Sequence, residues 1–217
     1  MNAAARQQMQ TLTLESRAWR LLATLFAYPD PGLPVMLKDG SLQAAVSEIF
    51  AGMDPTFTVC HAPSFFIEDT DHAALGEEYV RLFYFGERDT PLCSLYEGEH
   101  RGNRMEVMEE VLRFYGHFGL SATTLPNEMP DHLVTELEFL HFLSFQRVRY
   151  IRHGHDDGPF RRASTDFLSR HANRWMRHLG DRVATLGRAP FYQNAGLLLA
   201  RFMERFAGTE IPMIMRA

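Results

Sequence analysis

A short acidic segment ahead of a long apolar stretch holds the residues best suited to chemistry. Glu128, Pro130, Asp131 and His132 lie within five positions, and Pro126 lies just upstream. Because a proline restricts its own backbone and that of the preceding residue, Glu128 is expected in an extended conformation. Asp131 lies where a new helix should begin, so its carboxylate can cap backbone N–H groups or bind a cationic ligand. The segment predicts a polar recognition site at the start of a buried helix.

Two Glu-x-x-His pairs, Glu97–His100 and Glu138–His141, offer a different chemistry. Such i, i+3 pairs lie on one helix face, and ferritin-like bundles hold two metal ions with them plus a glutamate from each of two other helices. The pair at 97–100 lies among glycines, whose permissive backbone cannot fix metal ligands. A di-metal carboxylate enzyme is therefore the alternative hypothesis, with the further glutamates coming from Glu15, Glu77, Glu78, Glu109 or Glu204.

Other catalytic chemistry has little support in the chain. Cys60 and Cys93 have neither C-x-x-C nor zinc-site spacing, and no serine stands in a nucleophile-elbow sequence. Lys38 is the only lysine and no G-x-x-x-x-G-K occurs, which argues against nucleotide hydrolysis at a P-loop. We assign no catalytic residues and no metal ligands.

Composition indicates a globular protein of the reducing cytoplasm. The 217 residues are 46% hydrophobic and include 17 phenylalanines, more than a disordered chain would carry. Two cysteines cannot form a disulfide framework for this length. The first ten residues lack the apolar core of a signal peptide, and no run of about 18 apolar residues occurs. We expect a cytoplasmic chain without stable membrane insertion.

Charge is distributed unevenly along the chain. Residues 64–140 contain 16 acidic residues and 5 arginines, whereas residues 141–217 contain 6 acidic residues and 13 arginines. An acidic middle third should repel nucleic acid and attract a basic ligand through its summed field, although solvated helix faces would explain it equally well.

Apolar residues at helical spacing predict a succession of helices, and no long alternating run predicts a strand. Asn103 and Glu106 resemble a capping box, and residues 86–102 read as a loop. The predicted helices span residues 13–28, 41–50, 71–85, 103–115, 133–151, 160–179 and 191–207.

The predicted fold is all-α, a single globular domain over residues 1–217 with about eight to ten helices around a central buried helix from Leu133 to Ile151. That helix is chosen because its apolar residues cover nearly all faces. We expect an N-terminal half at about 12–120, a loop or hinge at about 121–130 and a C-terminal half at about 131–208.

Several segments resemble one known family in order along residues 14–207. The Glu128-x-Pro130-Asp131-His132 segment resembles the Glu-x-Pro-x-Asp-His signature of the TorD/DmsD family of molybdoenzyme-specific chaperones, with shorter spacing. Further similar segments are Tyr79-Val-Arg-Leu-Phe83, Pro91-Leu-Cys-Ser-Leu-Tyr96, Phe114-Tyr-Gly-His-Phe-Gly-Leu120 and Pro190-Phe-Tyr192. The chain departs from the family at Leu92 and Cys93, where many members place an aromatic residue or a second proline.

The resemblance implies a TorD-like chaperone, not an enzyme, and one without a cofactor of its own. Its partners would be the twin-arginine leader and the unfinished catalytic subunit of a DMSO-reductase-family molybdoenzyme, with export delayed until cofactor insertion. It could act as a monomer or a domain-swapped homodimer. A helical interaction scaffold with another partner is a third possibility.

A receptor for such a leader needs carboxylates beside an apolar groove, because the leader carries two adjacent arginines before an apolar stretch. The candidate peptide-binding carboxylates are Glu97, Glu99, Glu128 and Asp131, and His132 would either order Asp131 or sense pH near neutrality. The groove and its flanking loops would be formed by Tyr79, Phe83, Phe85, Pro91, Tyr96 and Pro130. Tyr79 and Phe83 could instead be core residues, and Glu136 and Glu138 are expected to be internal hydrogen-bond partners.

Overall fold

The structure is a computed structural model that describes residues 3–54, 65–86, 90–120 and 129–208. Within these ranges the regular structure is helical, and the only β-type pairing is an isolated antiparallel bridge between Tyr96 and His132. The prediction of an all-α fold is therefore confirmed. No helix among the described residues is long and apolar enough to cross a membrane.

The elements follow one another as short and long helices. Their bounds are α1 (Ala3–Phe26), α2 (Leu33–Lys38), α3 (Ser41–Met53), α4 (His72–Phe83), α5 (Glu97–Arg101), α6 (Arg104–His117), α7 (Leu133–Arg152), α8 (Gly158–Arg170), the 3-10 turn η3 (Ala172–Arg174), α9 (Met176–Leu186) and α10 (Pro190–Glu204).

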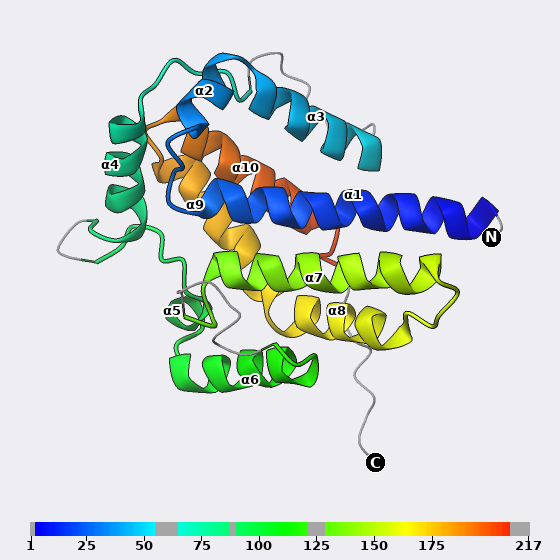
Figure 1. The fold of residues 1–217 in the computed structure, drawn as a ribbon. Helices are drawn as coiled ribbons and strands as arrows, with labels where there is room; N and C mark the ends of the chain where they lie inside the picture. Colours follow the sequence, from blue (N-terminus) through cyan, green and yellow to red (C-terminus); the bar gives the residue numbers. More distant parts are fainter. Residues whose placement is uncertain (1–2, 55–64, 87–89, 121–128, 209–217) are drawn as a thin grey trace.

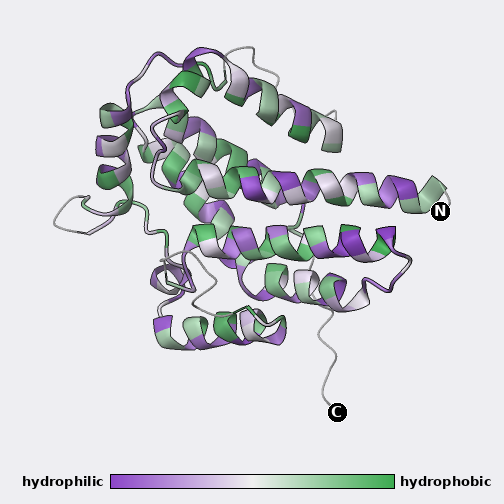
Figure 2. Ribbon diagram, in the orientation of Figure 1, coloured by the Kyte–Doolittle hydropathy of each residue, from purple (hydrophilic) through white to green (hydrophobic). Residues whose placement is uncertain are grey.

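Two long helices, α1 and α7, lie side by side through the middle of the molecule and run in opposite directions (Figure 1). Helix α3 packs on α1, α8 packs on α7, and α9 packs on α10. Leu137, Leu140 and Leu143 of α7 are fully buried, as expected for the central helix, although Phe145 reaches solvent on its outer side. Figure 2 shows hydrophilic and hydrophobic residues alternating along α1, the pattern of a helix with one polar face.

The close packing of α9 against α10 depends on two glycines. A Cβ atom at Gly196 would lie 2.6 Å from the carbonyl oxygen of Gly180, and one at Gly180 would lie 2.7 Å from the carbonyl oxygen of Gly196. Because no side chain separates the helices here, their backbones approach directly. This approach places the Tyr192 end of α10 against α4, where the Tyr192 hydroxyl donates to the Leu75 carbonyl at 3.0 Å.

Three predictions about the elements were wrong. The short helix α5 lies inside the stretch 86–102 that was expected to be a loop. The Arg-rich helix predicted over 160–179 is divided into α8, η3 and α9, because the backbone leaves helical geometry at His171 and Trp175. Asn103 makes no capping hydrogen bond to the backbone; its side-chain amide contacts Glu106 instead.

Candidate functional site

The segment that carries Asp131 is joined to the start of α5 by backbone hydrogen bonds. The Glu97 N–H donates to the Asp131 carbonyl at 2.9 Å, and the Leu133 N–H donates to the Leu95 carbonyl at 2.7 Å. With the Tyr96–His132 bridge between them, these bonds hold residues 95–97 beside residues 131–133. The acidic segment and α5 therefore form one rigid junction in front of α7.

Asp131 is fully buried at this junction and points toward α5. Its Oδ2 atom accepts the Gly98 N–H at 3.3 Å and lies 3.8 Å from Nε of Arg104. Burial raises the pKa of Asp131, and the Gly98 N–H and the Arg104 charge oppose that rise. The expected role of Asp131 as a cap for its own helix was wrong: His132 is the N-cap of α7, and its Nδ1 accepts the Val134 N–H at 3.2 Å.

Glu97 is also fully buried and is held from two directions. Nδ1 of His171 lies 2.8 Å from one carboxylate oxygen, and Nη1 of Arg101 lies 2.6 Å from the other. Burial alone would raise the pKa of Glu97, but these hydrogen bonds and the His171 interaction lower it overall. Glu97 is therefore an internal anion that ties α5 to the turn after α8.

Glu136, one turn into α7, completes the buried cluster. Burial raises its pKa well above the usual range, and the neighbouring Glu97 charge raises it further. Nε1 of Trp175 donates to Glu136 Oε2 at 3.2 Å. Glu136 is the internal hydrogen-bond partner that the sequence predicted, and its carboxyl group lies beside the Glu97 anion that opposes its ionisation.

The buried junction changes the assignment of several predicted site residues. Glu97 and Asp131 face the interior, so they are not presented to a ligand in this conformation. His132 is buried, and burial lowers its pKa to about 4, so the expected pH sensing near neutrality was wrong. Pro130 accepts the Tyr115 hydroxyl at its carbonyl oxygen, 3.0 Å away.

The remaining predicted carboxylates are Glu99 and Glu128. Glu99 is exposed on α5 and lies 3.6 Å from Nη1 of Arg104. That guanidinium also stands 4.9 Å from the ring centroid of half-buried Tyr96. Glu128 lies outside the described residues.

Tyr79 and Phe83 are core residues, which agrees with the alternative interpretation of both. They are 2% and 3% exposed and contact each other with ring centroids 4.9 Å apart. Their rings also meet Tyr192 of α10, so they join α4 to the core and cannot line an open groove.

The outer face of α4 instead forms an open apolar cleft of about 450 Å³. Phe85, the one predicted residue in its lining, is 66% exposed, and Tyr28 is 58% exposed. Val80 adds an exposed aliphatic surface, and Glu77 adds an exposed carboxylate that makes no ion pair among the described residues. Pro91, also predicted, is exposed on the connection between α4 and α5.

Sequence reasoning missed Tyr28, Val80 and Glu77 as lining residues. A signal was present, since Val80 lies off the inward stripe formed by Leu75, Tyr79, Leu82 and Phe83. An apolar residue on the polar face of an amphipathic helix is the mark of an exposed patch. Tyr28 gave no such signal because it is the last residue of the helix predicted over residues 13–28, directly before Pro29.

The metal-binding alternative has no support in the described structure. No group of three or more histidine, cysteine or acidic residues within the described ranges is arranged to hold a metal ion. His141 contacts Ser16 at 2.9 Å, and Nε2 of His100 lies 2.8 Å from the Ser94 carbonyl oxygen. Glu97 is occupied by Arg101 and His171.

Comparison with known proteins identifies the family. The model of the nitrate reductase delta subunit family matches residues 40–180. The selenate reductase assembly chaperone protein of Thauera selenatis is 35% identical over 185 residues, which cover 84% of this chain and 82% of that protein. The chlorate reductase assembly chaperone protein of Ideonella dechloratans is 44% identical over 104 residues, covering 47% of this chain and 53% of the other.

More distant relatives agree with this. The chaperone protein TorD of Vibrio cholerae serotype O1 is 27% identical over 135 residues, 60% of each chain. A crystal structure described as that of a redox enzyme maturation protein from Archaeoglobus fulgidus shares the fold, with a TM-score of 0.54 and 19% identity over 87% of this chain and 93% of that chain. The chain therefore belongs to the TorD/DmsD family of reductase assembly chaperones and is a chaperone, not an enzyme.

Proposed function

We propose that this chaperone acts in the cytoplasm on the precursor of a DMSO-reductase-family molybdoenzyme. It binds the twin-arginine leader and the unfinished catalytic subunit, so that export waits for cofactor insertion. Family membership supports this proposal, and relatives named for selenate, chlorate and perchlorate reductases suggest a client of that kind.

The observation that carries the leader-binding proposal is the exposed cleft on α4. Phe85, Tyr28 and Val80 offer an apolar surface for the hydrophobic stretch of a leader. At the same cleft Glu77 offers a carboxylate that has no ion pair within the described part of the chain, and arginine pairs favourably with carboxylates through its planar guanidinium.

Glu99 and Pro91 extend the proposed surface toward α5, and Glu128, which lies outside the described residues, stays a predicted leader contact. Helices α4 and α5 lie on the same side of the molecule, joined by the chain that carries Pro91 (Figure 1). In this proposal Tyr96, Glu97, Pro130, Asp131 and His132 support the surface, because their contacts hold α5 against α7. Tyr79 and Phe83 support it from the core side of α4.

Calorimetric titration with leader peptides of candidate clients tests the proposal. The chain should bind a peptide with two adjacent arginines and lose most of that affinity when both arginines are replaced by lysine, which cannot pair with a carboxylate through two parallel hydrogen bonds. If the folded chain binds none of these leaders, or binds the lysine peptides equally well, leader recognition by this chaperone is refuted.

A variant of the cleft locates the binding surface. Phe85→Ser should weaken leader binding by about tenfold, since truncating one central aromatic contact typically costs about 1–2 kcal/mol. Phe145→Ser on the outer side of α7 is the matched control, because Phe145 is also exposed and lies outside the cleft. Equal affinity losses in the two variants would show that the α4 cleft is not the leader-binding surface.

A further inference from the structure

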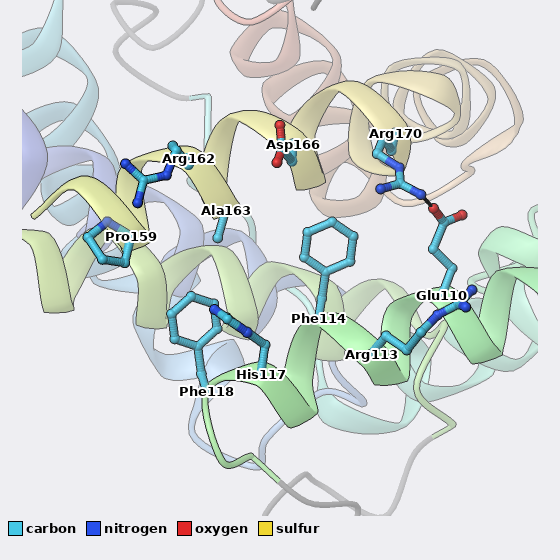
Figure 3. A pocket seen from close by; sticks show the side chains of 10 residues that line it. All are labelled: Glu110, Arg113, Phe114, His117, Phe118, Pro159, Arg162, Ala163, Asp166 and Arg170. Atoms are coloured by element: carbon cyan, nitrogen blue, oxygen red, sulfur yellow. Dashed lines mark ion pairs between the residues drawn. The ribbon is translucent and has the colours of Figure 1, made fainter.

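A second, larger groove of about 670 Å³ lies between α6 and α8. Figure 3 shows side chains from both helices facing into it, with Phe114 between the helices and Phe118 near Pro159 at one end. The Glu110–Arg170 ion pair lies at the opposite end. Among the described residues, none of those assigned to leader binding lines this groove.

The floor of the groove is aromatic and held in place by the core. The Phe114 ring meets the buried Phe167 ring edge-on at a centroid distance of 5.3 Å. The Phe118 ring stacks on Phe160 at 5.1 Å. Because these contacts fix Phe114 and Phe118 from behind, their half-exposed faces offer a preformed apolar surface one helical turn long.

The rim carries three arginines, of which one is neutralised by an ion pair among the described residues. Arg170 is paired with Glu110 and lies over the Phe114 ring. Arg113 and Arg162 are exposed, and neither makes an ion pair among the described residues. Asp166 is the remaining acidic residue of the lining, so the groove keeps an excess of positive charge in a chain of net charge -5.

We propose that the α6–α8 groove binds an acidic, apolar peptide segment. Apolar side chains of that segment would lie on Phe114 and Phe118, while its carboxylates pair with Arg113 and Arg162 through charge-assisted hydrogen bonds. This inference rests on the proposed function for the identity of the partner, which is a segment of the client's mature part. A twin-arginine leader does not fit, because its cations would meet Arg113 and Arg162.

In this proposal the chaperone has two docking surfaces that offer side chains of opposite charge to the client. The α4 cleft offers Glu77 to a cationic leader, and the α6–α8 groove offers two arginines to an anionic segment. Simultaneous contact at both would hold a client more firmly than either contact alone, provided that the connecting chain spans them.

A pair of synthetic peptides tests the groove without a known client. Both carry leucine and phenylalanine on one helical face; one has flanking glutamates and the other has lysines at the same positions. In a fluorescence-anisotropy titration the chain should bind the glutamate peptide at least tenfold more tightly than the lysine peptide. Equal affinities for the two peptides, or no binding of the glutamate peptide, would overturn the proposal.

Charge-reversal variants distinguish binding at the α6–α8 groove from a general effect of the protein's net charge on peptide affinity. The double variant Arg113→Glu, Arg162→Glu should lose at least tenfold in affinity for the glutamate peptide. The double variant Arg149→Glu, Arg152→Glu makes the same change in net charge at two exposed arginines of α7 and should keep the affinity of the unmodified chain. Equal losses of affinity in both double variants would mean that net charge alone controls binding of the glutamate peptide, and would refute binding at the groove.

Leader titrations with the same proteins keep the two proposals apart. The Arg113, Arg162 variant should bind the leader as the unmodified chain does. If it loses leader affinity together with affinity for the glutamate peptide, the groove is not a separate surface. If neither the unmodified chain nor its variants bind a leader while the glutamate peptide still binds at the groove, leader binding is refuted and peptide binding at the groove still holds.

Discussion

Asp131 joins two elements through its backbone and its side chain together. Its carbonyl oxygen accepts the Glu97 N–H and its carboxylate accepts the Gly98 N–H, so one residue fixes the first turn of α5. Glu97 then reaches back to His171. These acids stabilise the junction beside the proposed leader surface, which explains how a polar motif can be buried within a binding region.

Replacing Asp131 should therefore affect stability more than binding. Asp131→Asn puts an amide N–H₂ group where Oδ1 is buried without a hydrogen-bond partner among the described residues, so a donor would be left without an acceptor, which should lower the free energy of unfolding by about 1–3 kcal/mol. Chemical denaturation measures this change. Leader affinity at a temperature where the variant is folded should stay within about twofold.

Glu99→Gln on the same short helix is the matched comparison. Its exposed side chain should leave the free energy of unfolding within about 0.5 kcal/mol, while leader affinity falls. If Asp131→Asn instead abolishes leader binding at unchanged stability, Asp131 contacts the ligand directly and the junction must open to bind.

His132 makes stability depend on pH in a predictable direction. Burial lowers its pKa to about 4 in the folded chain, below the ordinary value of 6.5, so the unfolded chain binds the proton more readily between these values. The associated stability is fully present above pH 6.5 and is lost as the pH falls toward 4. The full loss would be about 3 kcal/mol.

A variant isolates this contribution from the other titrating groups. Asparagine is a favoured N-cap and does not titrate, so His132→Asn should keep the start of α7 and flatten the pH dependence of stability between pH 6.5 and 4. Urea titrations of the unmodified chain and of His132→Asn at four pH values measure how the free energy of unfolding of each depends on pH. An unchanged slope in the variant would mean that other groups control the acid sensitivity.

At the scale of elements, the crossing of α9 and α10 depends on the missing side chains of Gly180 and Gly196. A methyl group at Gly196 would meet backbone atoms of Gly180 and Ala184 at 2.6 Å, and backbone cannot move aside cheaply. Gly196→Ala should therefore lower the free energy of unfolding by about 1–3 kcal/mol despite the better helix propensity of alanine.

Gly116→Ala provides the contrasting control. A Cβ atom at Gly116 in α6 would meet nothing within 4 Å, so alanine should be neutral or stabilise the chain by up to about 1 kcal/mol. Thermal denaturation of both variants compares the two positions. If the Gly196→Ala protein is as stable as the unmodified chain, α9 and α10 can move apart to admit the methyl group without a loss of stability.

The helical fold and its central helix could be predicted from the sequence because apolar spacing is a local signal. Leu137, Leu140 and Leu143 follow one another at helical intervals and are buried together in α7. The cap of α4 was also predictable, since Asp71 precedes the apolar stripe and accepts the Ala74 N–H at 2.8 Å.

The break between α8 and α9 could not be predicted by the same means. His171 and Trp175 leave helical geometry to reach Glu97 and Glu136, which are 74 and 39 residues away in sequence. The inward direction of Asp131 likewise depends on α5, a helix that sequence spacing did not reveal. Contacts between distant segments outweigh local propensity at both places.

At the scale of the whole molecule, part of the charge asymmetry along the chain is neutralised internally. Glu97 and Glu110 of the acidic middle third pair with His171 and Arg170 of the basic last third. Exposed charges that remain, such as Glu77 and the arginines of the α6–α8 groove, are the ones available to partners. Binding at either surface should therefore weaken with added salt.

Photo-crosslinking of a twin-arginine leader to the chain shows whether the leader binds at the α4 cleft. With a photoreactive residue placed in the apolar stretch of the leader, mass spectrometry identifies the residues that it contacts. We expect crosslinks at the α4 cleft, on Tyr28, Val80 or Phe85, that an excess of unlabelled leader removes. Crosslinks confined to the α6–α8 groove, or scattered over the surface and unaffected by competitor, would contradict binding at the cleft.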